Sequence, residues 1–456
     1  MRLLGWKALV LAFVLTLPLV TPKIRGADEI EYFSYLRSLA FDHDVEFGNE
    51  YLHFHSLDPQ GLAGFKATFL DLREPQTGAH INFAPLGAGL LWSPFYLAAH
   101  LGVLLATAAG KSVAADGFSP PYVAAACYAS ALYGFLGLLL VHDALVRFGR
   151  FSPATATFAV LAVWLGTPLL YYMTIAPAFS HACSVFAVAL LVWLTLRLLD
   201  RGRSTPGDWA TVGAALGLAG LVREQDALFV VVPAGVLLAE ALRSRDWPLA
   251  LRKGLLFALC AALVFLPQLL AYRALNGTFS PSRMVARKLS YASPHFFLVL
   301  FDPGHGLFAW TPLLLFATAG LLALAARRRD LASVLLGLAF LLQVWINGSL
   351  DSWTQAGAFG SRRFISVTPA LAWGLAFLVK GTRAHRLGRL GTVVALVLFG
   401  WWNVSLMVQF GLKLMDRQRL EWPKVAVNQF TEVPRRLGRT ASLFFSDRER
   451  LLKETP

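Results

Sequence analysis

The sequence carries little charge and almost no cysteine. Only 15% of its 456 residues are charged, against about 25% in ordinary soluble domains, and 56% are hydrophobic. This composition argues against a soluble globular protein. The three cysteines, Cys127, Cys183 and Cys260, all lie inside apolar runs, and their number and placement fit neither a disulfide framework nor a zinc site.

Several motifs of known chemistry are missing as well. No glycine-rich phosphate loop precedes a helix in the required context, so nucleotide hydrolysis has no support. The pattern Gly-x-Ser-x-Gly is also absent, although this alone does not exclude a membrane acyltransferase. No internal repeat is detectable.

Basic residues outnumber acidic ones. The chain has 41 Lys and Arg against 27 Asp and Glu, a net charge of +14. Nucleic-acid binding would need this excess on a soluble surface, which the composition does not provide. The excess is typical of Lys and Arg in the cytoplasmic loops of a membrane protein, and no nucleic-acid partner is expected.

Long apolar runs are what the sequence does have. A helix needs about 20 apolar residues to cross a bilayer. About twelve segments approach that length, at residues 5–22, 83–109, 119–146, 152–172, 178–199, 209–222, 227–242, 251–275, 306–326, 331–346, 364–379 and 391–411. The sequence therefore predicts an all-α, polytopic integral membrane protein with about 11–12 transmembrane helices. The first segment lacks a small-residue cleavage site and is interpreted as an uncleaved anchor with its N-terminus inside.

Loop charges give an orientation, because Lys and Arg favour the cytoplasmic side. The stretches that must then face outside are 23–80, 173–181, 223–226, 276–305 and 347–363. The segment 83–118 must in that case begin and end on the same side, so either a helix near Pro94 is re-entrant or one segment does not cross. The expected domains are a membrane domain over 1–411, with outer loops at 23–80 and 276–305, and an amphipathic interfacial tail over 412–456.

The first outer loop, 23–80, is unusually acidic. It holds ten of the 27 acids: Asp28, Glu29, Glu31, Asp42, Asp44, Glu46, Glu50, Asp58, Asp71 and Glu74. One explanation is that any solvated loop is polar while membrane segments exclude acids. Another is that some of these carboxylates do chemistry.

Asp28 illustrates both explanations. With Glu31 three residues later, it has the spacing of a helix N-cap and its capping box. The helix that follows places Phe33, Leu36 and Ala40 on one face, so it is expected to be amphipathic and to lie along the membrane surface. Capping and catalysis are compatible, because a cap fixes the carboxylate at the helix end.

Six short elements of the chain resemble GT-C membrane glycosyltransferases, most of all the bacterial branch similar to protein O-mannosyltransferases and lipid A aminoarabinose transferases. They are Asp28-Glu29 with Tyr32, Arg37-Ser38-Leu39 and Asp42-His43-Asp44; His80 to Gly87; Trp92 to Phe95; Ala178 to His181; Gly306 to Pro312; and Phe359 to Phe364. The elements span positions 26 to 370. The family's usual Lys or Arg before paired prolines is replaced by His80, followed by the single Pro85.

The resemblance implies a GT-C-like helix bundle and a reaction. Members of such families transfer a sugar from a polyprenyl-phosphate carrier to a hydroxyl outside the membrane, and inversion at the anomeric carbon requires a base. Asp28 would be that base, with Glu29 as the alternative. The lipid-phosphate leaving group would need cations near the interface. Tyr32, Asp42, Asp44, His181 and His305 would line the substrate pocket.

Basic residues on the expected outer side are candidates for binding that phosphate. They are Arg283, Arg287 and Lys288, Arg362 and Arg363, and more weakly Arg37, His80 and Arg223. The alternative is that they pair with acids of the first loop or with lipid headgroups. No metal ligand is assigned and no cofactor is expected, although the acid pairs Asp28/Glu29 and Asp42/Asp44 could hold a divalent cation.

The leading hypothesis is therefore an inverting glycosyltransferase in the bacterial inner membrane. Its donor would be a polyprenyl-phosphate-linked sugar, its acceptor a hydroxyl on an envelope glycan, lipid or protein, and its site would face the periplasm or exterior. The alternative is a polytopic transporter or lipid flippase, which would place ionisable residues near the bilayer midplane and often shows repeated halves. A structural subunit of an envelope complex would need none of the outer basic residues.

Overall fold

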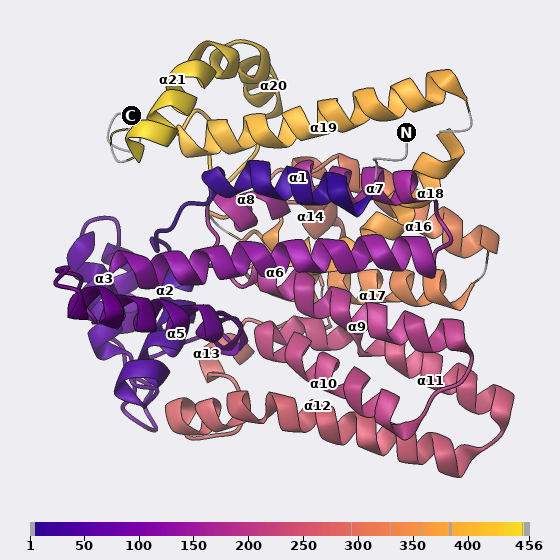
Figure 1. Ribbon diagram of the computed structural model, residues 1–456, viewed down its shortest axis with the longest axis horizontal. Helices are drawn as coiled ribbons and strands as arrows, with labels where there is room; N and C mark the ends of the chain where they lie inside the picture. The colour runs from indigo at the N-terminus through magenta and orange to yellow at the C-terminus, as the bar shows by residue number, and fades with distance from the viewer. Residues whose placement is uncertain are drawn as a thin grey trace. The chain divides into compact units, whose positions relative to one another are not determined.

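The computed structural model describes residues 5–292, 294–328, 330–355, 357–382, 385–448 and 450, and most of these residues lie in helices (Figure 1). Within them, the only β-type pairing is an isolated bridge between Arg73 and His80. The chain forms two compact units. Unit 1 comprises Met1–Leu19, Leu138–Tyr171 and Ser290–Pro456, and unit 2 comprises Val20–Gly137 and Tyr172–Leu289.

Unit 2 contains the first outer loop and the helices that follow it. Its helices are α2 (Ala27–Arg37), η2 (Ser38–Asp42), α3 (Gly48–Leu57), α4 (Ala63–Phe65), η3 (Lys66–Leu70), α5 (Gly87–Ala108), most of α6 (Pro120–Arg147), α9 (His181–Arg201), α10 (Pro206–Val222), η4 (Glu224–Val230), α11 (Val231–Ser244), α12 (Trp247–Asn276) and α13 (Arg283–Ala286); α8 (Leu169–Thr174) is divided between the units. Helices α10 and α12 pack along their length (Figure 1).

Small residues allow that packing. A Cβ added at Gly213 would lie 2.2 Å from the carbonyl oxygen of Phe257, and one at Gly217 would lie 2.5 Å from that of Ala261. Lipid gives helices no hydrophobic driving force to associate, so close backbone approach through glycines is what stabilises the pair.

We therefore expect Gly217→Ala to lower the stability of unit 2 by about 1–3 kcal/mol, the usual cost of overpacking. Gly220→Ala is the matched control on the same helix, because its added Cβ meets nothing closer than 3.6 Å. Thermal unfolding of the two purified variants is the measurement. Equal melting temperatures would contradict this account of the α10–α12 contact.

Unit 1 holds the remaining helices. They are α1 (Trp6–Thr16), η1 (Leu17–Leu19), the end of α6, α7 (Pro153–Leu165), α14 (Phe296–Phe301), α15 (Leu307–Trp310), α16 (Leu313–Arg328), α17 (Leu331–Gly348), η5 (Arg362–Val367), α18 (Thr368–Thr382), α19 (Arg386–Gly411), α20 (Trp422–Phe430) and α21 (Glu432–Ser446). Glycines again set the closest contact: a Cβ at Gly320 would lie 2.3 Å from the carbonyl oxygen of Gly374, across the α16–α18 packing.

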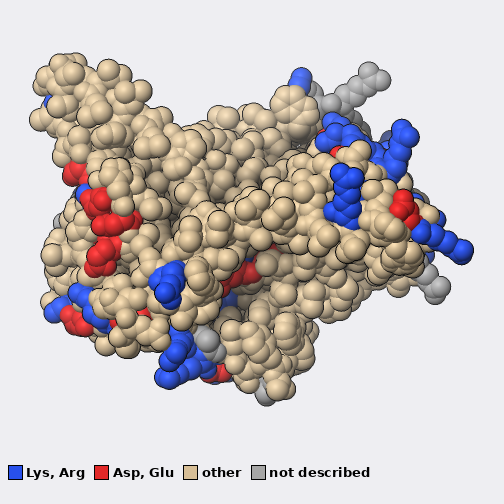
Figure 2. All heavy atoms as spheres, turned by 90° about the horizontal axis from the view of Figure 1, so that it is seen from below, with Lys and Arg blue, Asp and Glu red and all other residues tan. Residues whose placement is uncertain are grey.

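The described residues include eight helices long and apolar enough to cross a membrane, and three shorter apolar ones. Helix α12 shows the expected lipid-facing surface, with Leu251, Leu255, Leu259, Leu263, Leu266 and Leu270 all exposed. In Figure 2 the charged side chains gather in separate groups, with wide uncharged surface between them. The chain is thus a multi-pass, all-α membrane protein, as the sequence predicts.

Helix α5 bears on the ambiguity around Pro94. It runs unbroken through that proline. A Cβ at Gly89 would lie 3.4 Å from the backbone of Tyr32, so the first turns of α5 pack on α2. Its N-terminal Gly87 lies against the carbonyl of Leu221, at the end of α10 that leads to the outer stretch 223–226.

The start of α6 then returns to the middle of α5. The Tyr122 hydroxyl lies 2.6 Å from Nδ1 of His100, and its ring is 5.1 Å from that of Tyr96. In a hairpin that spans the membrane, Tyr122 would instead lie beside the last turn of α5. This geometry favours the alternative in which one segment, α5, does not cross.

That arrangement predicts that both ends of α5 are outside. In a variant with its native cysteines replaced, Ala115→Cys in the exposed α5–α6 loop should react in intact cells with a membrane-impermeant maleimide. Gly64→Cys in the first outer loop should react likewise, and Arg203→Cys, in a loop expected to be cytoplasmic, only after permeabilisation. Ala115→Cys following the Arg203→Cys pattern would show that α5 crosses.

Candidate active site in the first outer loop

Helix α2 carries the candidate catalytic carboxylates. Its N-cap is Gly26, and Oε2 of Glu29 accepts the backbone N–H groups of Arg25 and Gly26, each at 2.8 Å. The expected cap at Asp28 with Glu31 as its partner is therefore wrong by two residues. Glycine takes the extended N-cap conformation without a side chain, and the acid three positions later closes the turn.

Asp28 consequently lies inside the first helical turn, half-buried and next to Glu29. The partial positive charge of the helix end favours a carboxylate at this position. Burial raises the pKa of Glu29 to about 7, against the hydrogen bonds from Gly26 and Arg25 that favour its ionised form. Two adjacent carboxyl groups thus differ in environment, and both remain candidates for proton transfer.

The rest of α2 is buried on all sides. Every residue from Glu29 to Leu36 is buried, so the expected amphipathic helix on the membrane surface is wrong. Polar groups on α2 are instead held by other parts of unit 2. The Glu31 carboxylate accepts the N–H of Phe83 at 2.6 Å, and the Glu31 carbonyl accepts from the Asn82 amide at 3.1 Å. The segment following His80 is therefore a strap over α2.

A hydrogen-bonded chain joins α2 to two later outer segments. Ser180 donates to the Tyr32 hydroxyl at 2.8 Å, and Nη1 of Arg223 donates to Ser180 at 3.2 Å and to Nδ1 of His181 at 3.1 Å. Since Nδ1 accepts the hydrogen bond from Arg223, a neutral His181 ring carries its proton on Nε2. The structure thus brings Tyr32 and His181 together, with Arg223 as the cation between them.

Arg37 and Asp42 belong to a different network. Arg37 forms ion pairs with Asp42 and with Glu50, whose side chain is completely buried, and its guanidinium lies 4.6 Å from the Phe118 ring centroid. Because two carboxylates already neutralise Arg37, the phosphate-binding role predicted for it loses its basis. Asp44 accepts from Ser38 at 2.6 Å and from the N–H of Glu46 at 3.1 Å, which fixes a turn.

His80 is likewise occupied. It is buried, and its Nδ1 contacts the Glu46 carboxylate. A phosphate placed there would meet a carboxylate of the same sign. The histidine that replaces the family's basic residue is therefore held by Glu46. The predicted phosphate-binding role of His80 has no geometric support.

The basic residues of the second outer loop remain available. Arg283, Arg287 and Lys288 are exposed, and none of them forms an ion pair within the described part of unit 2. Nζ of Lys288 lies 5.6 Å from the ring centroid of Phe83, on the strap that crosses α2. This loop is therefore the exposed cationic surface beside the first outer loop.

The unit 1 candidates are arranged around a separate turn. Nε2 of His305 lies 2.7 Å from the carbonyl of Ala358, and its ring stacks on Trp310 at 4.7 Å. Burial lowers the pKa of His305, and the charge of Arg362 lowers it further. The guanidinium of Arg363 donates to the backbone and hydroxyl oxygens of Ser352 at 3.0 and 3.1 Å. His305 and Arg363 thus shape this turn.

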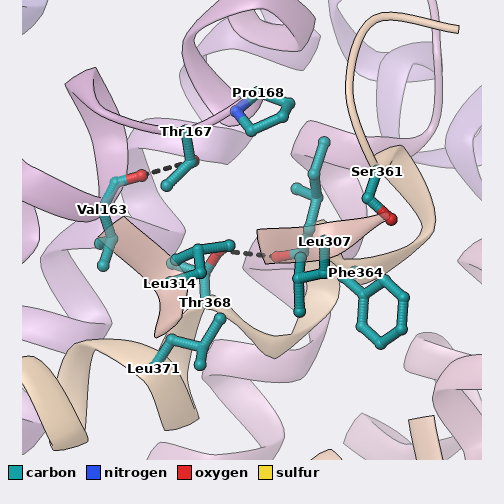
Figure 3. A pocket seen from close by; sticks show the side chains of 10 residues that line it. Val163, Thr167, Pro168, Leu307, Leu314, Ser361, Phe364, Thr368 and Leu371 are labelled. Atoms are coloured by element: carbon teal, nitrogen blue, oxygen red, sulfur yellow. Dashed lines mark hydrogen bonds between the residues drawn. The ribbon is translucent and has the colours of Figure 1, made fainter. Parts of the chain in front are cut away.

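In the part of the chain that the structure describes, no metal cluster accompanies these residues, and the pocket beside the unit 1 candidates is small. The described ranges contain no group of three or more His, Cys, Asp or Glu side chains suited to a metal ion. In unit 1, the pocket of Figure 3, between α7, α15, α16, η5 and α18, has a volume of about 10 Å³ and mostly apolar walls. That is room for about one water molecule, so it is a packing gap.

The sequence assigns no site role to Glu31, Ser180 and Glu50, and it does not single out Gln268, which accepts the N–H of Leu86 at 2.8 Å. Each bonds to a residue between 13 and 182 positions away. Gln268 alone carried a signal, since a glutamine inside an apolar span must find a polar partner.

The described helices form a polytopic membrane bundle, and its fold is GT-C-like. A comparison with solved structures found ArnT from Cupriavidus metallidurans bound to undecaprenyl phosphate, with a TM-score of 0.51 and 15% identity over 96% of this chain and 77% of that one. The Archaeoglobus fulgidus oligosaccharyltransferase in its apo form has a TM-score of 0.47 and 14% identity, over 93% and 55% of the two chains. No family model and no curated protein matches. The resemblance seen in the sequence is thus matched by the fold.

Proposed function

We propose that the protein is an inverting glycosyltransferase of the cytoplasmic membrane, with its site on the outer face. The donor is a sugar linked to polyprenyl phosphate, and the acceptor carries a hydroxyl. The observation that carries this proposal is the N-terminal turn of α2, where Asp28 and Glu29 lie side by side in a GT-C-type fold.

The residues present fit each step of such a transfer. Asp28 removes the proton from the acceptor hydroxyl, whose oxygen attacks the anomeric carbon. The bond between that carbon and the phosphate oxygen breaks, and polyprenyl phosphate leaves with the electron pair. Lys288 and Arg287, exposed and without ion pairs in the described part of unit 2, stabilise the charge of the leaving group, and Arg223 supplies a half-buried cation.

Membranes containing the protein provide the test. They are supplied with a panel of radiolabelled polyprenyl-phosphate sugars, and labelled product and released lipid phosphate are followed. We expect transfer from one donor, lost in the Lys288→Ala/Arg287→Ala variant and kept in Arg73→Ala, another exposed arginine of the outer loops. No transfer from any donor, together with movement of a solute or lipid across the membrane, would establish the transporter or flippase alternative instead.

A further inference from the structure

Helices α20 and α21, in unit 1, pack on the last long helix, α19 (Figure 1). The rings of Trp422 and Trp402 stack at 4.9 Å, and Nε2 of Gln409 donates to the carbonyl of Val425 at 3.3 Å. Trp402 lies nine residues before the end of α19, about 14 Å along the helix axis. Helix α20 therefore lies alongside the last turns of a helix that is long and apolar enough to span the membrane.

Helix α20 turns a polar side inward and an apolar side outward. Gln429 is buried, and the amide of Asn428 donates to the carbonyl of Leu414 at 3.1 Å. On the outward side, Val427 is 59% exposed and Phe430 is 76% exposed, more than any other aromatic side chain that the structure describes. Water disfavours such an inverted helix, because its apolar side chains gain no free energy of burial, whereas bilayer hydrocarbon favours it.

Helix α21 is amphipathic, with one apolar side. Val433, Leu437 and Phe444 share this side at helical spacing. Val433 is buried, but Leu437 is still 36% exposed and the neighbouring Phe445 is 61% exposed. The described protein thus covers only part of the apolar side. A helix of this kind lies in the interface of a bilayer with its apolar side toward the acyl chains.

The opposite side of α21 is basic. Arg435, Arg436 and Arg439 are exposed there, and the one acid of α21, Glu432, pairs with Arg435 at 3.4 Å and with Arg436 at 3.0 Å. One carboxylate does not balance three guanidinium groups, so this side keeps a positive charge. The expected orientation places the end of α19 outside, where Lys and Arg are normally depleted. Their presence on this side indicates an anionic partner.

Both ends of this surface are held by unit 1. Helix α20 is fixed on α19, and the guanidinium of Arg448, just after α21, lies 4.1 Å from the Phe444 ring centroid and donates to the carbonyl of Pro18 at 2.7 Å. Before α20, Leu412 and Leu420 are buried, and the N–H of Leu420 donates to the carbonyl of Pro303 at 3.0 Å. The exposed amphipathic surface is therefore confined to residues 422–448 and is preformed.

We propose that α20 and α21 bind anionic phospholipid of the outer leaflet. Val427 and Phe430 lie among the acyl chains, and Arg435, Arg436 and Arg439 contact the headgroup phosphates. The sequence predicts only an amphipathic tail, whereas this proposal names its partner and the residues that face it. It is independent of the proposed function, because the occupant is membrane phospholipid and not the sugar donor.

The position of the helices is tested with spin labels on the full-length protein, with its three cysteines replaced, in vesicles of phosphatidylcholine and phosphatidylglycerol. A label at Val427→Cys should be relaxed by oxygen, which concentrates in hydrocarbon, more than by a water-soluble nickel chelate. A label at Ser442→Cys, exposed on the basic side of α21, should show the reverse. Preferential relaxation of the Val427 label by nickel, or dipolar broadening between two labelled copies, would overturn the proposal.

The choice of lipid is tested with a trace of phosphatidylglycerol that carries a photoreactive diazirine. Peptides from α20 and α21 should be labelled. Arg435→Gln/Arg439→Gln should reduce this labelling about thirtyfold, because each basic side chain near an anionic surface strengthens binding roughly fivefold. Lys66→Gln/Arg73→Gln removes the same charge from exposed positions of the first outer loop and should leave labelling of α20 and α21 unchanged.

High salt should weaken the labelling of the wild type, since it screens exposed charges. A phosphatidylcholine probe should label the wild type and the Arg435→Gln/Arg439→Gln variant equally and weakly. Labelling by phosphatidylglycerol that survives in this variant, that the phosphatidylcholine probe matches, or that is replaced by cross-links to another protein would overturn the proposal. None of these measurements requires sugar transfer, so they stand apart from the test of the proposed function.

Discussion

Asp28→Asn is expected to reduce sugar transfer by roughly 10²–10⁴-fold, the range that loss of a general base produces. Asparagine keeps the size and the place of Asp28 in the first turn of α2 but cannot take up the acceptor's proton. Donor binding should change little, so the loss falls on kcat. Steady-state kinetics with a saturating lipid-linked donor is the measurement.

The variant Glu29→Gln tests which of the two adjacent carboxyl groups, Asp28 or Glu29, acts as the base. The glutamine oxygen can still accept the N–H groups of Arg25 and Gly26, so the cap and the orientation of Asp28 are kept. We expect this variant to retain activity within about tenfold, since a neutral cap replaces a charged one at small cost.

The pH profile distinguishes the same two assignments. A carboxyl group with a pKa of about 7, such as Glu29, changes charge between about pH 6 and 8. If Glu29 were the base, kcat would rise through this range, and Glu29→Gln would remove the rise. If Asp28 is the base, the wild type and Glu29→Gln give profiles of the same shape, and a large loss in Glu29→Gln with an active Asp28→Asn would reverse the assignment.

Arg37→Ala is expected to have the largest effect on stability, about 3–5 kcal/mol, as in other proteins where one partner of a buried ion pair is removed. The change leaves Glu50 completely buried, and Asp42 mostly so, without their cation. It also removes the guanidinium from the Phe118 face. Arg73→Ala is the matched control, because exposed Arg73 donates only to nearby backbone carbonyls and should cost no more than about 0.5 kcal/mol.

The loss in unfolding free energy caused by Arg37→Ala should increase with pH. Burial raises the pKa of Glu50 from 4.5 to about 7, and the hydrogen bond from Arg37 opposes the rise. The pKa of Glu50 is higher in the folded state than in the unfolded state, so protonation of Glu50 stabilises the fold. This stabilisation is complete below about pH 4.5 and is lost as the pH rises to about 7. Without Arg37 the ionised form has no partner, so thermal unfolding should show a larger difference between variant and wild type at pH 8 than at pH 5. A difference independent of pH would contradict this role of Glu50.

The membrane-spanning helices could be predicted from the sequence because one property, the length of each apolar run, determines whether a segment can cross the bilayer. Each of the twelve apolar segments contains helix, but two are broken: 152–172 into α7 and α8, and 306–326 into α15 and α16. The helix at Asp28 was also predicted, but its start was not. An aspartate is a good N-cap, yet a glycine two residues earlier with an acid at the right spacing forms the cap instead.

Only those parts of the candidate site that consist of residues adjacent in the sequence could be predicted. Asp28 and Glu29 stand out as an acid pair after an apolar run. The ion pairs of Arg37 with Glu50 and of His80 with Glu46 depend on how the loop turns back on itself, at separations of 13 and 34 residues. Loop charge alone cannot separate a cation that holds the loop together from one that faces a substrate.

The amphipathic character expected of α2 failed for a related reason. Three apolar residues on one face predict a surface helix, but Tyr32, Tyr35 and Glu31, outside that set, are also buried under other segments. Burial of such a helix requires hydrogen-bond partners such as Asn82 and Ser180. The eleven residues of the helix do not indicate which distant residues supply these bonds.

The bonds that join the first outer loop and the start of α5 to α12 and the second outer loop also set an order for biogenesis. Leu86 bonds to Gln268, Thr77 to Leu275 and Glu74 to Ser282, so residues made early are held by residues made 182 to 208 positions later. At about 5–20 residues per second, the first loop must wait roughly 10–40 s for these partners to be made. During that interval the ten acids of the first loop lack these partners, so the surroundings of the candidate catalytic helix α2 are completed only after α12 has been made.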